Sequence, residues 1–135
     1  MKQKIDTGEA EMAFTDAIAI SAVEEENSVF SNLSERMAET CKIKGVIGYI
    51  VRSNTSAIID LEEQDKIIEY AALSYQIHDS SQEIAKQLNL GETESTLVEG
   101  KNIKVLCMSV GENRISVFME KSANHTGIIK RIILH

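Results

Sequence analysis

The chain has 135 residues, enough for one domain with a hydrophobic core, and it is 43% hydrophobic and 26% charged, like an ordinary globular protein. Its formal net charge of −7 argues against nucleic acid as a partner, because phosphate contacts need clustered lysine and arginine. No apolar run approaches the roughly 18 residues that a membrane span needs, and the first residues do not have the pattern of a signal peptide. We therefore expect a cytoplasmic protein.

Residues 1–26 are predicted to be an acidic N-terminal extension, since they hold seven acidic and only two basic side chains. Residues 14–23 fit a short helix, and they fit a strand equally well because Ile18 and Ile20 alternate with small residues. Three glutamates then mark a solvated boundary. The expected organisation is this extension followed by a folded domain over residues 27–135.

An amphipathic helix is predicted at the start of this domain, beginning at Asn27 or Ser28 and ending near residues 42–44. Its apolar residues recur at spacings of three and four, namely Val29, Phe30, Leu33, Met37 and Cys41.

A β-hairpin is predicted next, with strands over residues 45–51 and 56–60 and a turn between them. Arg52 is expected at the tip of this hairpin. An arginine there could contact a partner or a phosphate, although an exposed loop arginine without a role is the simpler interpretation.

A long helix is predicted over residues 64–91, because about 25 residues pass without glycine or proline before Leu90-Gly91 ends it. A polar strip runs along it, formed by Asp65, Glu69, Gln76, Ser80, Glu83 and Gln87. Apolar residues lie on both sides of the strip: Ile67, Ile68, Ala71, Ala72 and Tyr75 on one side, and Leu73, Ile77, Ile84 and Leu88 on the other. Such a helix is either deeply buried in a monomer or packed against a second partner as well as a sheet. We assign the Leu73 side to the sheet and the Ile68 side to a partner helix.

Three strands and a helix complete the predicted chain. The strands cover residues 93–99, 102–110 and 114–120, and the helix covers residues 123–135. The predicted order is α-β-β-α-β-β-β-α. This is an α+β, profilin-like fold, with a five-stranded, mostly antiparallel sheet sandwiched between one long helix and two shorter helices.

No catalytic, cofactor-binding or metal-binding motif is found in the sequence. His78 and Asp79 are adjacent, so on a helix their side chains diverge by about 100° instead of pairing, and we expect a surface or interface histidine. Cys41 and Cys107 lie in apolar patterns without a ligand spacing, which favours buried, reduced thiols over a disulfide or a metal site.

The run from Val29 to Ile133 resembles the roadblock/LC7 domain of dynein light-chain roadblock and its prokaryotic relatives. The matching motifs are a glycine-led first hairpin, with Gly45, Val46 and Asp60, and an LGxxxxxxVEG segment, with Leu90, Gly91, Val98, Glu99 and Gly100. The sequence departs from the family at Ser56-Ala57, where a bulkier apolar residue is common, and in its acidic extension.

The resemblance implies a sheet with the long helix alone on one face. It also implies a homodimer in which the long helices pack together and the edge strands that follow them pair. The interface residues expected on this basis are Ile67, Ile68, Ala71, Ala72 and Tyr75 on the helix and Thr93, Ser95 and Leu97 on the strand.

The same resemblance implies a partner, because prokaryotic relatives are associated with small Ras-like GTPases. The expected function is a non-enzymatic scaffold or regulator that binds such a GTPase and modulates its nucleotide cycle. The alternative is a profilin-like or PAS-like sensor module that binds a small ligand between helix and sheet.

Overall fold

The computed structural model describes residues 2–6 and 17–133, with side chains described from residue 28 onward. Its elements in chain order are β1 (Lys2–Asp6), α1 (Ala17–Thr40), β2 (Val46–Arg52), β3 (Ser56–Leu61), a 3₁₀ turn (Gln64–Lys66), α2 (Ile67–Gln87), β4 (Ser95–Glu99), β5 (Ile103–Val110), β6 (Asn113–Glu120) and α3 (His125–Ile133). The predicted helices and strands are all present in the predicted order.

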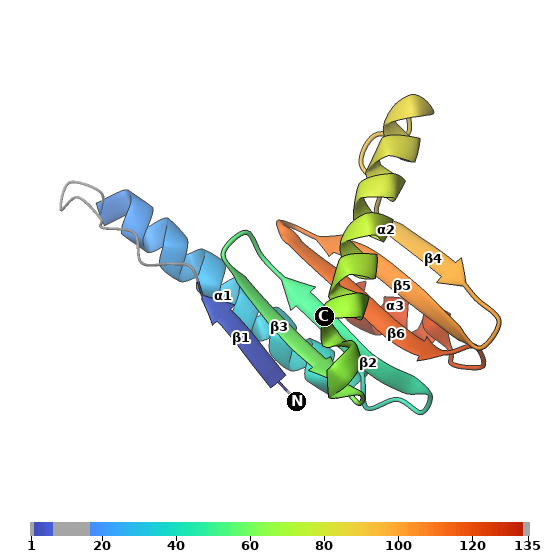
Figure 1. Ribbon diagram of the computed structural model, residues 1–135. Helices are drawn as coiled ribbons and strands as arrows, with labels where there is room; N and C mark the ends of the chain where they lie inside the picture. The colour runs from blue at the N-terminus through green and yellow to red at the C-terminus, as the bar shows by residue number, and fades with distance from the viewer. Residues whose placement is uncertain (1, 7–16, 134–135) are drawn as a thin grey trace.

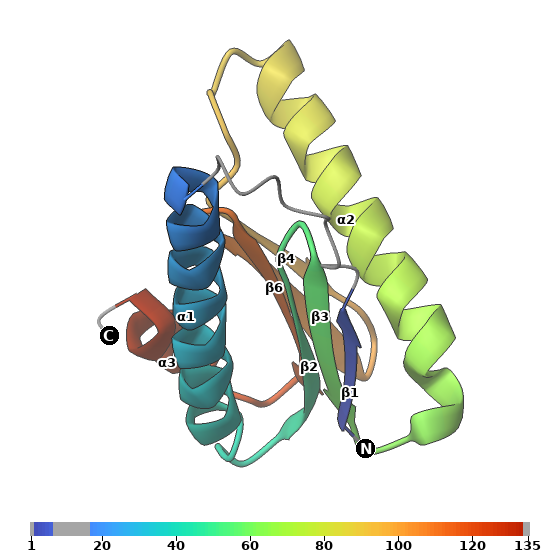
Figure 2. The ribbon, with the colours of Figure 1, turned by 90° about the vertical axis from the view of Figure 1, so that its left-hand side faces the viewer.

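The strands form one sheet in the order β1-β3-β2-β6-β5-β4, and every neighbouring pair is antiparallel. Helix α2 crosses one face of the sheet alone, while α1 and α3 lie side by side on the other face (Figures 1 and 2). The predicted α+β sandwich is therefore confirmed.

The N-terminal region differs from the expectation in two ways. Strand β1 pairs with the outer edge of β3 and adds a sixth strand to the five that were predicted. Helix α1 begins at Ala17, so the expected boundary after residue 26 falls inside it. The physical reason is that no glycine or proline occurs between residues 17 and 40, and glutamates are good helix formers. Residues 14–16 lie outside the described residues.

Two turns differ in detail from the sequence prediction. Arg52 belongs to β2, where it pairs with Ala57 of β3, and so it is not a turn residue. Helix α2 ends through Asn89, which has a left-handed φ of 55°, while the amide of Leu90 donates to the carbonyl of Ala85 at 2.8 Å. Gly91 follows this cap with a φ of 80°.

The sheet separates two hydrophobic cores. The larger core lies under α1 and α3, where Phe30, Leu33 and Met37 of α1 and Ile128 and Ile132 of α3 are buried, as the predicted spacing of three and four requires. The smaller core lies under α2, and its centre is Phe118 of β6, whose ring stacks on Tyr70 at 4.7 Å between centroids.

Candidate functional site

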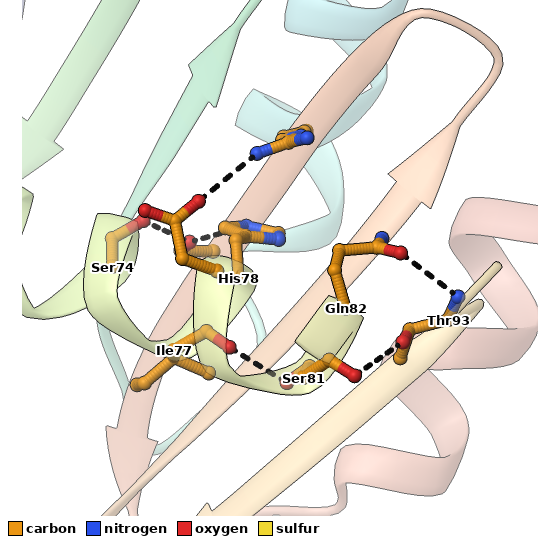
Figure 3. A network of polar contacts seen from close by, with 9 residues as sticks. Ser74, Ile77, His78, Ser81, Gln82 and Thr93 are labelled. Atoms are coloured by element: carbon orange, nitrogen blue, oxygen red, sulfur yellow. Dashed lines mark hydrogen bonds and ion pairs between the residues drawn. The ribbon is translucent and has the colours of Figure 1, made fainter. Parts of the chain in front are cut away.

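The side of α2 that faces the sheet is polar at its centre. Ser74 is 2% exposed, and its hydroxyl is hydrogen-bonded to the hydroxyl of Ser116 on β6. His78, one turn further, is 5% exposed, and its Nε2 lies 3.4 Å from the same Ser116 oxygen (Figure 3). The thiol of Cys107 on β5 lies 3.5 Å from Ser116 Oγ. The hydroxyl of Ser116 therefore contacts three polar groups beneath the helix.

The expected surface position of His78 is wrong, because its side chain is buried between α2 and the sheet. This position holds His78 in its neutral form. Burial, followed by the charges of Arg52 and Arg114, lowers its pKa from 6.5 to about 4, and Asp79 opposes the shift only in part. A neutral imidazole offers one donor and one acceptor nitrogen, which suits a hydroxyl partner.

A second set of hydrogen bonds fixes α2 to the segment that leads into β4. The hydroxyl of Thr96 donates to Ser81 Oγ at 2.8 Å. The hydroxyl of Thr93 donates to the Ser81 carbonyl at 2.9 Å (Figure 3). The Thr93 amide also reaches Gln82 Oε1 at 3.5 Å. These bonds show that the Ser81 side of the helix faces β4.

The two apolar sides of α2 have the predicted roles only in part. Ile67 is 9% exposed and packs under the helix with Ala71, so neither belongs to a free surface. Of the residues that we assigned to the sheet, Ile77 packs against the core under α2 as predicted, whereas Leu73, Ile84 and Leu88 are 41%, 57% and 63% exposed. The reason is that Ser74 and His78 occupy the sheet-facing line, which turns the flanking apolar residues outward on both sides.

The remaining predicted helix residues are exposed on the other flank. Ile68 is 85% exposed, Tyr75 is 54% exposed and Ala72 is also exposed. The guanidinium carbon of Arg52, at the end of β2, lies 3.4 Å from the centre of the Tyr75 ring. The Tyr75 flank therefore looks toward β2, whereas Leu73, Ile84 and Leu88 form the β4-side flank.

Strand β4 has a neighbour on one side only within the described part of the chain. Thr96 faces α2, so Val98, two residues later, lies on the same face, where it is 45% exposed. Of the predicted strand residues, Ser95 is exposed, Leu97 is half-buried against the α1 side, and Thr93 lies before the strand. Val98 was not among the predicted strand residues, because the face that each strand residue occupies follows from the sheet register.

A polar pocket of about 590 Å³ opens at the other flank of α2. Arg52 and Arg114 line it together with Tyr75, Glu92 and Glu112. Arg52 was expected to be exposed, but it is 9% exposed because the Tyr75 ring covers it at the end of β2. Arg114 was not singled out in the sequence, and no periodic signal there connects it to Arg52.

The described residues hold no cluster of three or more histidine, cysteine or acidic side chains that could bind a metal. Both cysteines are free: Cys107 is buried and Cys41 is half-buried. No described helix has the length and apolar character to cross a membrane.

Several solved structures are similar to this fold. A roadblock/LC7 domain from Streptomyces avermitilis superposes with a TM-score of 0.63 over 73% of this chain and 87% of that one, at 10% sequence identity. The chain has the roadblock/LC7 fold. Myxococcus xanthus MglB is similar at a TM-score of 0.62 and 13% identity, over 78% of this chain and 82% of MglB.

A structure of MglB with a tetrameric arrangement also shares the roadblock/LC7 fold of this chain, with a TM-score of 0.62 and 14% identity over 76% of this chain and 80% of that one. No family model matches the sequence, and no curated protein matches it either. The expected resemblance is thus confirmed at the level of the fold, and what the chain binds has to be argued from its own surfaces.

Proposed function

We propose that this protein is a non-enzymatic, homodimeric scaffold or regulator that binds a small Ras-like GTPase and modulates its nucleotide cycle. The observation that carries the proposal is the β4-side flank of α2, where Leu73, Ile84 and Leu88 are exposed beside β4, whose outer edge no described strand covers. Large apolar side chains gathered on one helix flank are typical of an interaction site.

The exposed edge of β4 supports pairing with the same strand of a second copy. An unpaired edge strand is a template for pairing with an identical strand, and a two-fold axis makes both copies use the same surface. Pairing through β4 brings the partner helix to the β4 side of α2. Leu73, Ile84 and Leu88 are therefore the residues that support a helix-to-helix contact, in place of Ile68, Ala72 and Tyr75.

The GTPase part of the proposal is supported by the roadblock/LC7 fold, whose prokaryotic relatives are associated with small Ras-like GTPases. A scaffold acts through surfaces, and the β4-side flank of α2 is an exposed apolar surface of this kind.

The oligomeric state tests the first half of the proposal. Light scattering over a range of concentrations is compared for wild type, Ile84→Glu on the β4-side flank, and Ala72→Glu as the matched control on the opposite flank. We expect dimers for wild type and Ala72→Glu and a monomer for Ile84→Glu, because a buried carboxylate in the helix contact is costly. A monomeric wild type contradicts the proposal, and a monomer for Ala72→Glu alone places the interface on the Tyr75 flank.

Binding and hydrolysis test the second half. A Ras-like GTPase from the same organism, loaded with GDP or with a non-hydrolysable GTP analogue, is passed over the immobilised dimer, and its GTP hydrolysis is followed with excess protein. We expect binding that depends on the nucleotide and a changed hydrolysis rate. Equal, negligible retention of both forms together with an unchanged rate overturns the GTPase assignment and leaves the dimer intact.

A further inference from the structure

Arg52 and Arg114 stand directly opposite each other on neighbouring antiparallel strands, β2 and β6. Both side chains face α2, because Ile50, two residues before Arg52, packs in the core under that helix, and Ser116, two residues after Arg114, is bonded to Ser74. Like charges at opposed positions of two strands destabilise a sheet. A negative charge placed between the two arginines would relieve their repulsion.

Part of the Arg52 guanidinium has no partner among the described residues. Arg52 is 9% exposed and lines the pocket, and no described residue forms a hydrogen bond with its Nη2. The Tyr75 ring covers one face of the guanidinium at 3.4 Å. Stacking of this kind leaves the N–H groups at the edge free to bind in the plane. An arginine keeps its charge in proteins, so the buried cation cannot neutralise itself by losing a proton.

The carboxylates around the pocket compensate Arg52 only weakly. Asp79 Oδ1 is 3.9 Å from Arg114 Nη1, and the Asp79 side chain is 76% exposed, so this ion pair is weak. The charge of Asp79 also favours the Arg52 cation, but no ion pair joins the two residues within the described part of the chain. Glu92 and Glu112 are exposed lining residues, and neither forms an ion pair with an arginine within the described residues.

We propose that this pocket binds a small phosphate-bearing molecule, with Arg52 and Arg114 as its anchors. A phosphate brings up to two negative charges and several acceptor oxygens, which match two guanidinium groups from adjacent strands. The pocket volume of about 590 Å³ exceeds what a phosphate group fills, so it leaves room for an organic portion. Glu92 and Glu112 can accept hydrogen bonds from hydroxyl groups of that portion.

The site does not depend on the proposed dimer or on a GTPase. It lies on the Tyr75 flank, whereas the proposed contact between copies lies on the β4-side flank. Failure of one proposal therefore leaves the other standing.

The test uses the full chain and two probes, inorganic phosphate and ribose 5-phosphate, with ribose and sodium chloride as controls at matched ionic strength. Amide shifts of Ser53 and Gly111, which line the pocket, are followed by NMR. We expect saturable shifts with both phosphate probes and none with ribose. Arg52→Gln and, separately, Arg114→Gln should weaken binding about tenfold or more, since each removes a charge-assisted hydrogen bond. Arg131→Gln on α3, across the sheet, is the matched control and should bind like wild type.

The outcomes separate cleanly. Tighter binding of ribose 5-phosphate than of phosphate supports a phosphate ester as the ligand, and equal binding supports the phosphate group as the sole recognised part. Wild-type affinity in both Arg52→Gln and Arg114→Gln, or no saturable shift in wild type, overturns the proposal.

Discussion

Ser74 on α2 and Ser116 on β6 join the long helix to the sheet through a hydrogen bond between their hydroxyls, at a depth where Ser74 is 2% and Ser116 is 1% exposed. Buried hydroxyls are costly unless they are paired, so this contact fixes both the height and the rotation of α2 over the sheet. The rotation in turn decides which apolar side chains are left in solvent.

Removing one hydroxyl of this pair should cost more than half of the stability that is lost when both are removed, because the remaining hydroxyl stays buried without its partner. Ser116→Ala leaves Ser74 Oγ and His78 Nε2 without their shared partner, and we expect a loss of about 1–3 kcal/mol in the free energy of unfolding. Urea unfolding of Ser74→Ala, Ser116→Ala and the double variant measures this. The double variant should lose less than the sum of the singles. Strict additivity would mean that the two hydroxyls are not coupled.

Stability should fall between neutral and mildly acidic pH because of His78. Its folded pKa of about 4 lies below its ordinary value of 6.5, so the unfolded chain binds the proton first as the pH falls. The stabilisation is complete above pH 6.5 and is lost progressively down to about pH 4. Between pH 7.5 and pH 5.0 we expect His78 to account for a loss of about 2 kcal/mol.

The measurement compares urea unfolding of wild type with that of His78→Gln at both pH values. The glutamine cannot titrate, so the variant should lose less stability on acidification than wild type does. Parallel losses in the two proteins would show that carboxylates, and not His78, cause the acid sensitivity.

Gly48→Ala should be among the most destabilising small changes in the chain. A methyl group there would collide with the carbonyl oxygen of Asp60 and lie 2.8 Å from Leu61 Cα on β3, so backbone would have to move. We expect a cost of about 2 kcal/mol or more. Gly91→Ala is the matched control, because no atom of the described residues beyond its two chain neighbours lies within 4 Å of the added carbon and its φ of 80° alone costs about 1 kcal/mol. An equal effect of the two changes in thermal unfolding would contradict the close β2–β3 contact.

Both cysteines should react slowly while the protein is folded. Burial, together with the nearby charge of Asp60, raises the pKa of Cys41 to about 12, and burial raises the pKa of Cys107 as well. Since the thiolate is the reactive form, a disulfide reagent at pH 8 should modify the folded protein at least about tenfold more slowly than the protein in urea. Immediate labelling of two thiols without denaturant would show that the two cysteines are not shielded in the folded protein.

The element order, the two hairpins and the antiparallel sheet follow from the sequence, because apolar periodicity is a local property. Phe30, Leu33 and Met37 repeat at helical spacing and are buried together, and the glycine-led run after Gly45 forms the strand that it predicts. The long uninterrupted helix after Gln64 and its surplus of apolar surface could likewise be read from the residues alone. The apolar flanks were visible, as was the polar strip between them.

Only the tertiary structure decided how that helix is used. Ser74 and His78 look unsuited to a sheet-facing position until β6 supplies the hydroxyl of Ser116, a partner 42 residues from Ser74 that no periodicity reveals. The register between β2 and β6 likewise places Arg52 opposite Arg114, and no local pattern reveals it. Local pattern sets which segments are helices and strands, because backbone geometry repeats along the chain. Long-range pairing sets which side chains are buried, exposed or brought into opposition, because it depends on residues that meet only when the sheet forms.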